Sequence, residues 1–89
     1  MAYDVLSRLK AEGRLFDCVI EVADKGSPSG RKAVFGKDII ELGRSRIVFL
    51  GGETGNEKLA APMEAVQEIF CSDKVIWRKK RRIERIYPR

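Results

Sequence analysis

The stretch Phe16–Val22, with the sequence FDCVIEV, decides the fold because the spacing of apolar residues changes there. Upstream, residues 3–11 (YDVLSRLKA) repeat apolar side chains at helical spacing, and Gly13 stands where a helix would end. From Phe16 onward, β-branched residues and partial alternation predict a strand. The chain is therefore expected to begin with one helix and to continue in strands.

Short apolar segments follow this first strand, and each is bounded by turn-forming residues. The loop DKGSPSG at 24–30 leads to a second strand, RKAVF at 31–35. Further strands are predicted in KDIIEL (37–42), RIVFL (46–50), VQEIF (66–70) and KVIWRK (74–79), with a hairpin turn at 43–45. The segment 63–70 also fits a short amphipathic helix, although a strand is favoured. The pattern at 59–61 is too weak to predict a strand.

One helix and about six short strands predict an α+β fold. In it the N-terminal helix packs on a curled, mainly antiparallel sheet or a small, partly open β-barrel. The 89 residues leave room for one hydrophobic core. We therefore expect a single domain over residues 1–77 and a basic C-terminal tail over residues 78–89.

The charge is concentrated in that tail. The chain carries 18 Lys and Arg residues against 13 Asp and Glu residues, a net charge of +5. Seven of the basic residues and only one acidic residue lie in 78–89, so the rest of the chain is close to neutral. A basic arm attracts polyanions, which makes RNA the expected partner and an acidic protein a second possibility. No apolar run approaches the roughly 20 residues of a membrane span, and no secretory signal is evident, so a cytoplasmic protein is expected.

The composition lacks the residues that enzymes most often use for catalysis. Without histidine there is no imidazole base, no Ser-His or Cys-His nucleophile pair and no His metal ligand. Two cysteines cannot complete a zinc site of the usual Cys/His kind. No spacing singles out a pair of carboxylates, so we expect neither an enzyme nor a cofactor nor a bound metal.

The two cysteines, Cys18 and Cys71, both lie in apolar segments. A free cysteine behaves as a small buried hydrophobe, and both are expected to be reduced core residues. The alternative is a disulfide, which intracellular proteins of hyperthermophiles do contain.

Three places combine cations with groups that suit nucleic acid. The loop 24–32 joins cations to glycines and serines, as phosphate-binding loops do, although it also fits an ordinary polar loop. The arginines of the turn at Arg44 and Arg46 would form a second group of cations near the loop 24–32. Alternatively, they are ordinary exposed residues of a turn, without a binding role. Trp77 precedes a basic run and could stack on a base, although a tryptophan in a strand is more often core. The predicted nucleic-acid contacts are Lys25, Gly26, Arg31, Lys32, Arg44, Arg78, Lys79, Lys80, Arg81 and Arg82. Among them, Gly26 is expected to allow the loop geometry and the others to supply positive charge.

The order of these motifs resembles a small archaeal family of RNA cyclic-group end-recognition domains, over about residues 3–80. The resemblance begins with an N-terminal helix that leads into an apolar strand. It continues in three later segments: Lys25-Gly26-Ser27-Pro28, the run from Gly36 to Arg44, and Lys74-Val75-Ile76-Trp77-Arg78. The resemblance implies non-catalytic recognition of RNA ends, such as 2′,3′-cyclic phosphates, in RNA processing or repair. It also implies that Lys25 and Gly26 occupy a basic-Gly position and that Trp77 and Arg78 belong to the closing strand.

Two functions are carried forward. The first is an RNA-binding module without catalysis. The second is a protein-interaction subunit whose basic tail docks on an acidic partner or a ribonucleoprotein. The second draws support from the near-neutral body and from residues 61–66, which read APMEAV where the family has a His-Arg pair.

Overall fold

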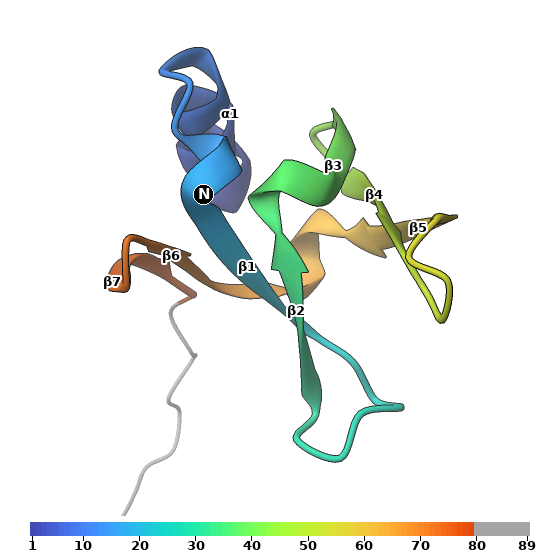
Figure 1. Cartoon of the computed structure of the whole chain (residues 1–89). Helices are drawn as coiled ribbons and strands as arrows, with labels where there is room; N and C mark the ends of the chain where they lie inside the picture. The colour runs from blue at the N-terminus through green and yellow to red at the C-terminus, as the bar shows by residue number, and fades with distance from the viewer. Residues whose placement is uncertain (80–89) are drawn as a thin grey trace, which may run out of the picture.

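The computed structural model describes residues 1–79, and these begin with helix α1 (Ala2–Ala11), shown in Figure 1. The helix buries Leu6 and Leu9 in the core, as the apolar spacing predicted. Gly13 ends the helical region with a φ of 72°, and its N–H donates to the carbonyl of Lys10. Glycine suits this left-handed conformation because it has no Cβ.

Within residues 1–79, seven strands and three short 3₁₀ turns follow the helix. The strands are β1 (Cys18–Ala23), β2 (Arg31–Phe35), β3 (Ile39–Leu42), β4 (Arg46–Gly51), β5 (Glu57–Pro62), β6 (Val66–Cys71) and β7 (Lys74–Arg78). The turns are η1 (Leu15–Asp17), η2 (Gly36–Asp38) and η3 (Met63–Ala65). The strands form two antiparallel sheets in the orders β2–β1–β6–β7 and β3–β4–β5, which do not close into a barrel. The predicted α+β fold, with a helix packed on mainly antiparallel sheet, is confirmed.

Several elements differ from the sequence-based expectations. The predicted strands at 16–22 and 37–42 begin only at Cys18 and Ile39, because residues 16–17 and 37–38 lie in η1 and η2. Strand β5 occupies the segment whose pattern is too weak to predict a strand, because it pairs with β4 along its whole length although it buries only Ala61. At 63–70 the chain first makes the turn η3, and β6 then begins at Val66. The predicted strand is therefore confirmed, with a single 3₁₀ turn in front of it.

The core lies where the inner faces of the two sheets meet helix α1. Leu6, Ile20, Ile47 and Ile69 are fully buried there. Strand β1 alternates strictly and sends its first, third and fifth side chains into this core. Its other side chains, Val19, Glu21 and Ala23, lie on the opposite side of the sheet β2–β1–β6–β7, which we call the outer face.

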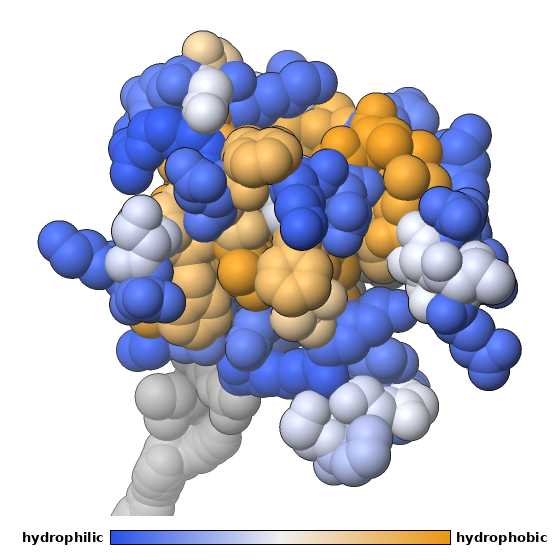
Figure 2. All heavy atoms as spheres, viewed as in Figure 1, coloured by the Kyte–Doolittle hydropathy of each residue, from blue (hydrophilic) through white to orange (hydrophobic). Residues whose placement is uncertain are grey.

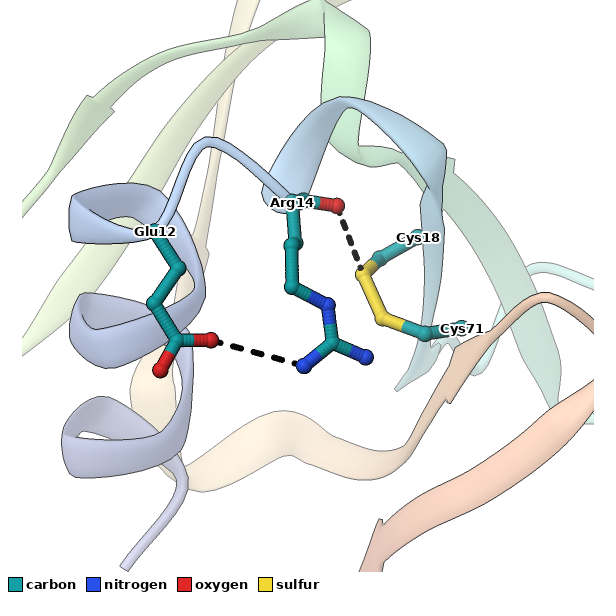
Figure 3. The surroundings of a disulfide bond; sticks show 4 residues. All are labelled: Glu12, Arg14, Cys18 and Cys71. Carbon is teal, nitrogen blue, oxygen red and sulfur yellow. Dashed lines mark hydrogen bonds and ion pairs between the residues drawn. A yellow bond between two sulfur atoms is a disulfide. The ribbon is translucent and has the colours of Figure 1, made fainter.

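The expectation that both cysteines are reduced is wrong. Cys18 and Cys71 form a disulfide that joins β1 to β6 (Figure 3). The two residues are direct partners in the strand register, and their Cα atoms are only 4.3 Å apart. A cross-strand disulfide is possible because the register, and not the sequence spacing, brings the two sulfurs together.

The Cys18 sulfur also lies 3.2 Å from the carbonyl oxygen of Arg14, which follows helix α1. A disulfide sulfur carries no hydrogen, so this is a close contact and not a hydrogen bond. The guanidinium of Arg14 meanwhile pairs with Glu12 at 3.4 Å. The disulfide therefore lies directly beneath the segment that connects the helix to the first strand.

Candidate nucleic-acid interface

A solvent-open cavity of about 600 Å³ lies where four parts of the chain meet. They are the start of α1, the turn between β3 and β4, the turn η3, and the end of β7. We call it the Tyr3–Trp77 cavity. Its lining residues are Met1, Ala2, Tyr3, Arg44, Ser45, Pro62, Met63, Glu64, Val66, Trp77 and Lys79.

Backbone hydrogen bonds hold the cavity wall together. The N–H of Met63 donates to the carbonyl of Ser45 at 2.8 Å, which fixes η3 against the β3–β4 turn. Met63 itself is buried, so it anchors this contact in the core. The N–H of Lys79 donates to the carbonyl of Gln67 at 2.8 Å and continues the pairing of β7 with β6 by one residue. The cavity is thus supported by secondary structure on several sides.

Two aromatic side chains form its apolar surface. Tyr3 and Trp77 are both half-buried and both pack against the hydrophobic core. Trp77 faces inward because it is paired with the buried Ile69, after a bulge in β7. The core interpretation and the stacking interpretation of Trp77 are therefore compatible, since the residue contacts the core and lines the cavity.

Two of the predicted cationic residues border the same cavity. The guanidinium carbon of Arg44 lies 5.6 Å from the centre of the Tyr3 ring, within cation–π range, and the side chain is exposed. The ammonium of Lys79 donates a 2.6 Å hydrogen bond to the carbonyl of Glu64. Aromatic rings beside cations are the groups that bind a base by stacking and its phosphate by charge.

The other predicted contacts within residues 1–79 lie elsewhere. Lys25 and Gly26 belong to the β1–β2 loop at the bottom of Figure 1, whereas the β3–β4 turn with Arg44 is at the upper right. The two loops do not form neighbouring basic points, because the hairpins that carry them extend in different directions. Lys32 is half-buried, and its ammonium lies 5.5 Å from the centre of the Phe49 ring.

Glycine is not required at position 26 for the geometry of the loop, which corrects the role predicted for it. Its φ lies outside the left-handed region, and a Cβ there would meet only the Asp24 carboxylate, at an ordinary 3.6 Å. The loop instead requires Gly30, which has a φ of 79° and whose N–H donates to the carbonyl of Ser27. Lys25 remains an exposed cation in this loop.

Arg31 and Arg78 are already engaged on the outer face. The Arg31 guanidinium donates to Glu21 at 3.0 Å and to Glu68 at 3.1 Å, and Arg78 donates to the second oxygen of Glu68. The side chain of Glu68 is only 13% exposed, so it is the centre of this network. A phosphate would have to displace these carboxylates, which makes both arginines poorer phosphate ligands than Arg44.

This network predicts a pH dependence of stability. The pKa of Glu68 is lowered, chiefly by the hydrogen bond from Arg78, while partial burial acts in the opposite direction. The pKa of Glu68 is lower in the folded protein than in the unfolded chain. The ion-pair network therefore contributes fully to the free energy of unfolding above the ordinary glutamate pKa. This contribution is lost as the pH falls through the pKa of Glu68 in the folded protein.

We therefore expect acidification to lower the unfolding free energy of the wild type more than that of Glu68→Gln. Urea unfolding between about pH 7 and about pH 3 measures both. Glu64→Gln is the matched control, because Glu64 is exposed and its carboxylate makes no ion pair among residues 1–79. If acidification lowers the unfolding free energy of the wild type and of Glu68→Gln equally, the ion-pair network does not contribute to the pH dependence of stability.

Sequence reasoning does not assign Tyr3 or Glu64 to a site. The sequence places Tyr3 only in the helical stripe, and its closeness to Arg44 depends on how α1 packs against the β3–β4 turn. The residues Lys80, Arg81 and Arg82 lie outside the described part of the chain. Within residues 1–79, no group of three or more His, Cys, Asp or Glu side chains is arranged to hold a metal.

Comparison with known proteins adds no relative. No protein-family model, no curated protein and no solved structure matches the chain. Among the described residues, no helix is long and apolar enough to cross a membrane. The resemblance to the RNA end-recognition family therefore stays a prediction.

Proposed function

We propose that the protein is a non-catalytic RNA-binding module that holds the end of an RNA strand in the Tyr3–Trp77 cavity. The observation that carries the proposal is the meeting of Arg44, Lys79 and Trp77 around one cavity. Arg44 and Lys79 are predicted nucleic-acid contacts, Trp77 is the stacking alternative to a core residue, and the three come from distant segments. A chain end fits better than an internal segment, because a cavity can enclose a terminal base and phosphate.

Each group has a distinct role in this proposal. Trp77 and Tyr3 supply rings against which the terminal base stacks. Arg44 binds the phosphate, because its planar guanidinium can offer two N–H groups to two phosphate oxygens. Lys79 adds a point charge, and the basic residues that follow it attract the rest of the strand. RNA processing or repair is the setting that the family resemblance implies.

Binding of short RNAs tests the proposal. A single-stranded RNA ending in a 2′,3′-cyclic phosphate or in a 3′-hydroxyl is titrated with the full chain, and fluorescence anisotropy is recorded at about 50 mM and about 200 mM salt. If about 3–5 phosphates are neutralised, the log–log slope of affinity against salt is roughly −2 to −3.5. Preference for the cyclic phosphate is expected to survive neutralisation of Lys80, Arg81 and Arg82 to glutamine.

Arg44→Ala is expected to weaken RNA binding about tenfold or more, which corresponds to the loss of a charged hydrogen bond. Arg46→Ala is the matched control: Arg46 is also exposed and lies two positions away, but it lines a separate hollow on β4 and β5. Trp77→Leu should cost roughly 1–3 kcal/mol of binding through lost stacking. Equal effects of the two arginine variants, or binding that disappears with the tail charges alone, would contradict the cavity as the binding site.

A further inference from the structure

The outer face presents an apolar row that crosses all four strands of its sheet. In strand order the row consists of Phe35, Val19, Phe70 and Val75, which are successive partners in the strand register. Figure 2 shows hydrophobic surface gathered in front of β1 and β2, bordered below by hydrophilic side chains. We call these four residues the outer apolar row.

Much of this row is open to solvent. Phe35 is 49% exposed and Val75 is 42% exposed, although they stand at opposite edges of the sheet. Contiguous exposed apolar surface on a small domain is typical of an interaction site, and aromatic side chains are the groups that interfaces favour.

The charge beside the row is negative. A hollow of about 410 Å³ has Val19 and Phe70 in its lining, together with Asp17, Glu21, Ser72 and Asp73. Glu21 is paired with Arg31, but within residues 1–79 neither Asp17 nor Asp73 makes an ion pair. Asp73 is fixed in the tight β6–β7 turn with a φ of 67°. Two carboxylates without an ion-pair partner among residues 1–79 thus lie beside Val19 and Phe70, the middle of the apolar row, at one end of the outer face.

The second row of the outer face does not cancel this charge. It contains the arginines and glutamates of the ion-pair network, Arg31, Glu21, Glu68 and Arg78, whose charges balance one another. The face therefore has an apolar centre and a negative end. A polyanion such as RNA would be repelled there, whereas a cationic side chain next to apolar ones would be attracted.

We propose that the outer face binds a cationic segment of another protein, with apolar side chains on the outer apolar row and a Lys or Arg beside Asp17 and Asp73. This goes beyond the proposed RNA binding and uses a different surface. Trp77 points inward to the cavity, whereas Val75 in the same strand lies on the outer face beside Phe70. The protein would then hold RNA on one side and a basic polypeptide on the other.

A synthetic peptide of about ten residues with alternating Leu and Lys, labelled with fluorescein, is the probe for the full chain. Two control peptides replace either all Leu or all Lys with Ser. The alternating peptide is expected to bind more tightly than both controls, with an affinity that falls as salt is raised. Absence of binding, or equal binding of the Lys-Ser peptide, overturns the proposal, because charge alone would then account for it.

Variants of the face make the test specific. Phe35→Ser should weaken peptide binding about five- to tenfold, from the loss of apolar burial. Ile40→Ser is the matched control, because Ile40 is 48% exposed but lies on β3 in the other sheet. The double variant Asp17→Asn and Asp73→Asn should weaken binding about threefold and reduce its salt dependence. Asparagine tolerates the positive φ of position 73, so the turn is preserved.

Two further results distinguish binding of a basic protein segment from RNA binding and from dimerisation at the outer face. Phe35→Ser is expected to leave RNA affinity unchanged, and a parallel loss of RNA binding would overturn the assignment of this face to a protein partner. Sedimentation of the free protein is expected to show a monomer. A dimer that Phe35→Ser dissociates would mean that the face is occupied by a second copy of this chain, and would overturn the proposal as well.

Discussion

Reduction of the Cys18–Cys71 disulfide is expected to lower the free energy of unfolding by about 4 kcal/mol. The bond joins residues separated by 53 positions, so it closes a long loop. In the chain-entropy account, a closed loop of this length removes many conformations from the unfolded chain and leaves the native state in place. A small domain typically has only about 5–15 kcal/mol of stability in total, so the loss is severe.

Urea unfolding of the same protein with and without dithiothreitol measures this difference without any change of sequence. The double variant Cys18→Ala and Cys71→Ala should be destabilised to a similar or greater extent and should not respond to dithiothreitol. Thiol labelling of the denatured, unreduced protein should find no free Cys18 or Cys71. Equal unfolding midpoints in the oxidised and reduced forms would show that the bond does not stabilise the fold.

The disulfide also bears on where the protein works. Such bonds persist in oxidising compartments and in the intracellular proteins of hyperthermophiles, and are rare in other cytosolic proteins. The expected cytoplasmic location therefore stays a prediction, and it is compatible with the bond in a hyperthermophilic source.

The local elements can be predicted from the sequence because each is encoded by its own neighbours. Apolar spacing predicts α1, and alternation with β-branched residues predicts β1 and β4. Strand β5 escapes prediction because its sequence, EKLAAP, has little β-propensity of its own. Its partner β4 supplies the hydrogen bonds that make it a strand, and that pairing is not visible in a local pattern.

The candidate site depends on contacts between distant residues, and only part of it can be predicted. The residue types of Arg44, Trp77 and Lys79 point to nucleic acid, but nothing in the sequence places them around one cavity. Arg31 is predicted as a phosphate ligand because its loop is basic. Its partner Glu68 lies 37 positions away and becomes a neighbour only through the β1–β6 register. The same register creates the disulfide that the spacing does not reveal.

Gly36→Ala is expected to destabilise the fold by about 4 kcal/mol or more, or to prevent folding. Gly36 is buried at the point where β2 passes into η2. A Cβ there would overlap the carbonyl oxygen of Leu15 and would lie 3.2 Å from the carbonyl oxygen of Cys18. Both are backbone atoms, so no side-chain rotation can relieve the overlap, and η1 would have to separate from η2.

Circular dichroism during urea unfolding measures the effect, and Gly26→Ala is the control in the same protein. At position 26 the backbone is outside the left-handed region and the nearest atom would lie 3.6 Å from the alanine Cβ, so the change should shift stability by at most about 1 kcal/mol. A Gly36→Ala protein that unfolds at the wild-type midpoint would show that η1 and η2 are not in close contact. Because η1 precedes β1 and η2 precedes β3, that result would also mean that the two sheets are joined differently. The Tyr3–Trp77 cavity, which contains residues of both sheets, could then not have the shape on which RNA binding rests.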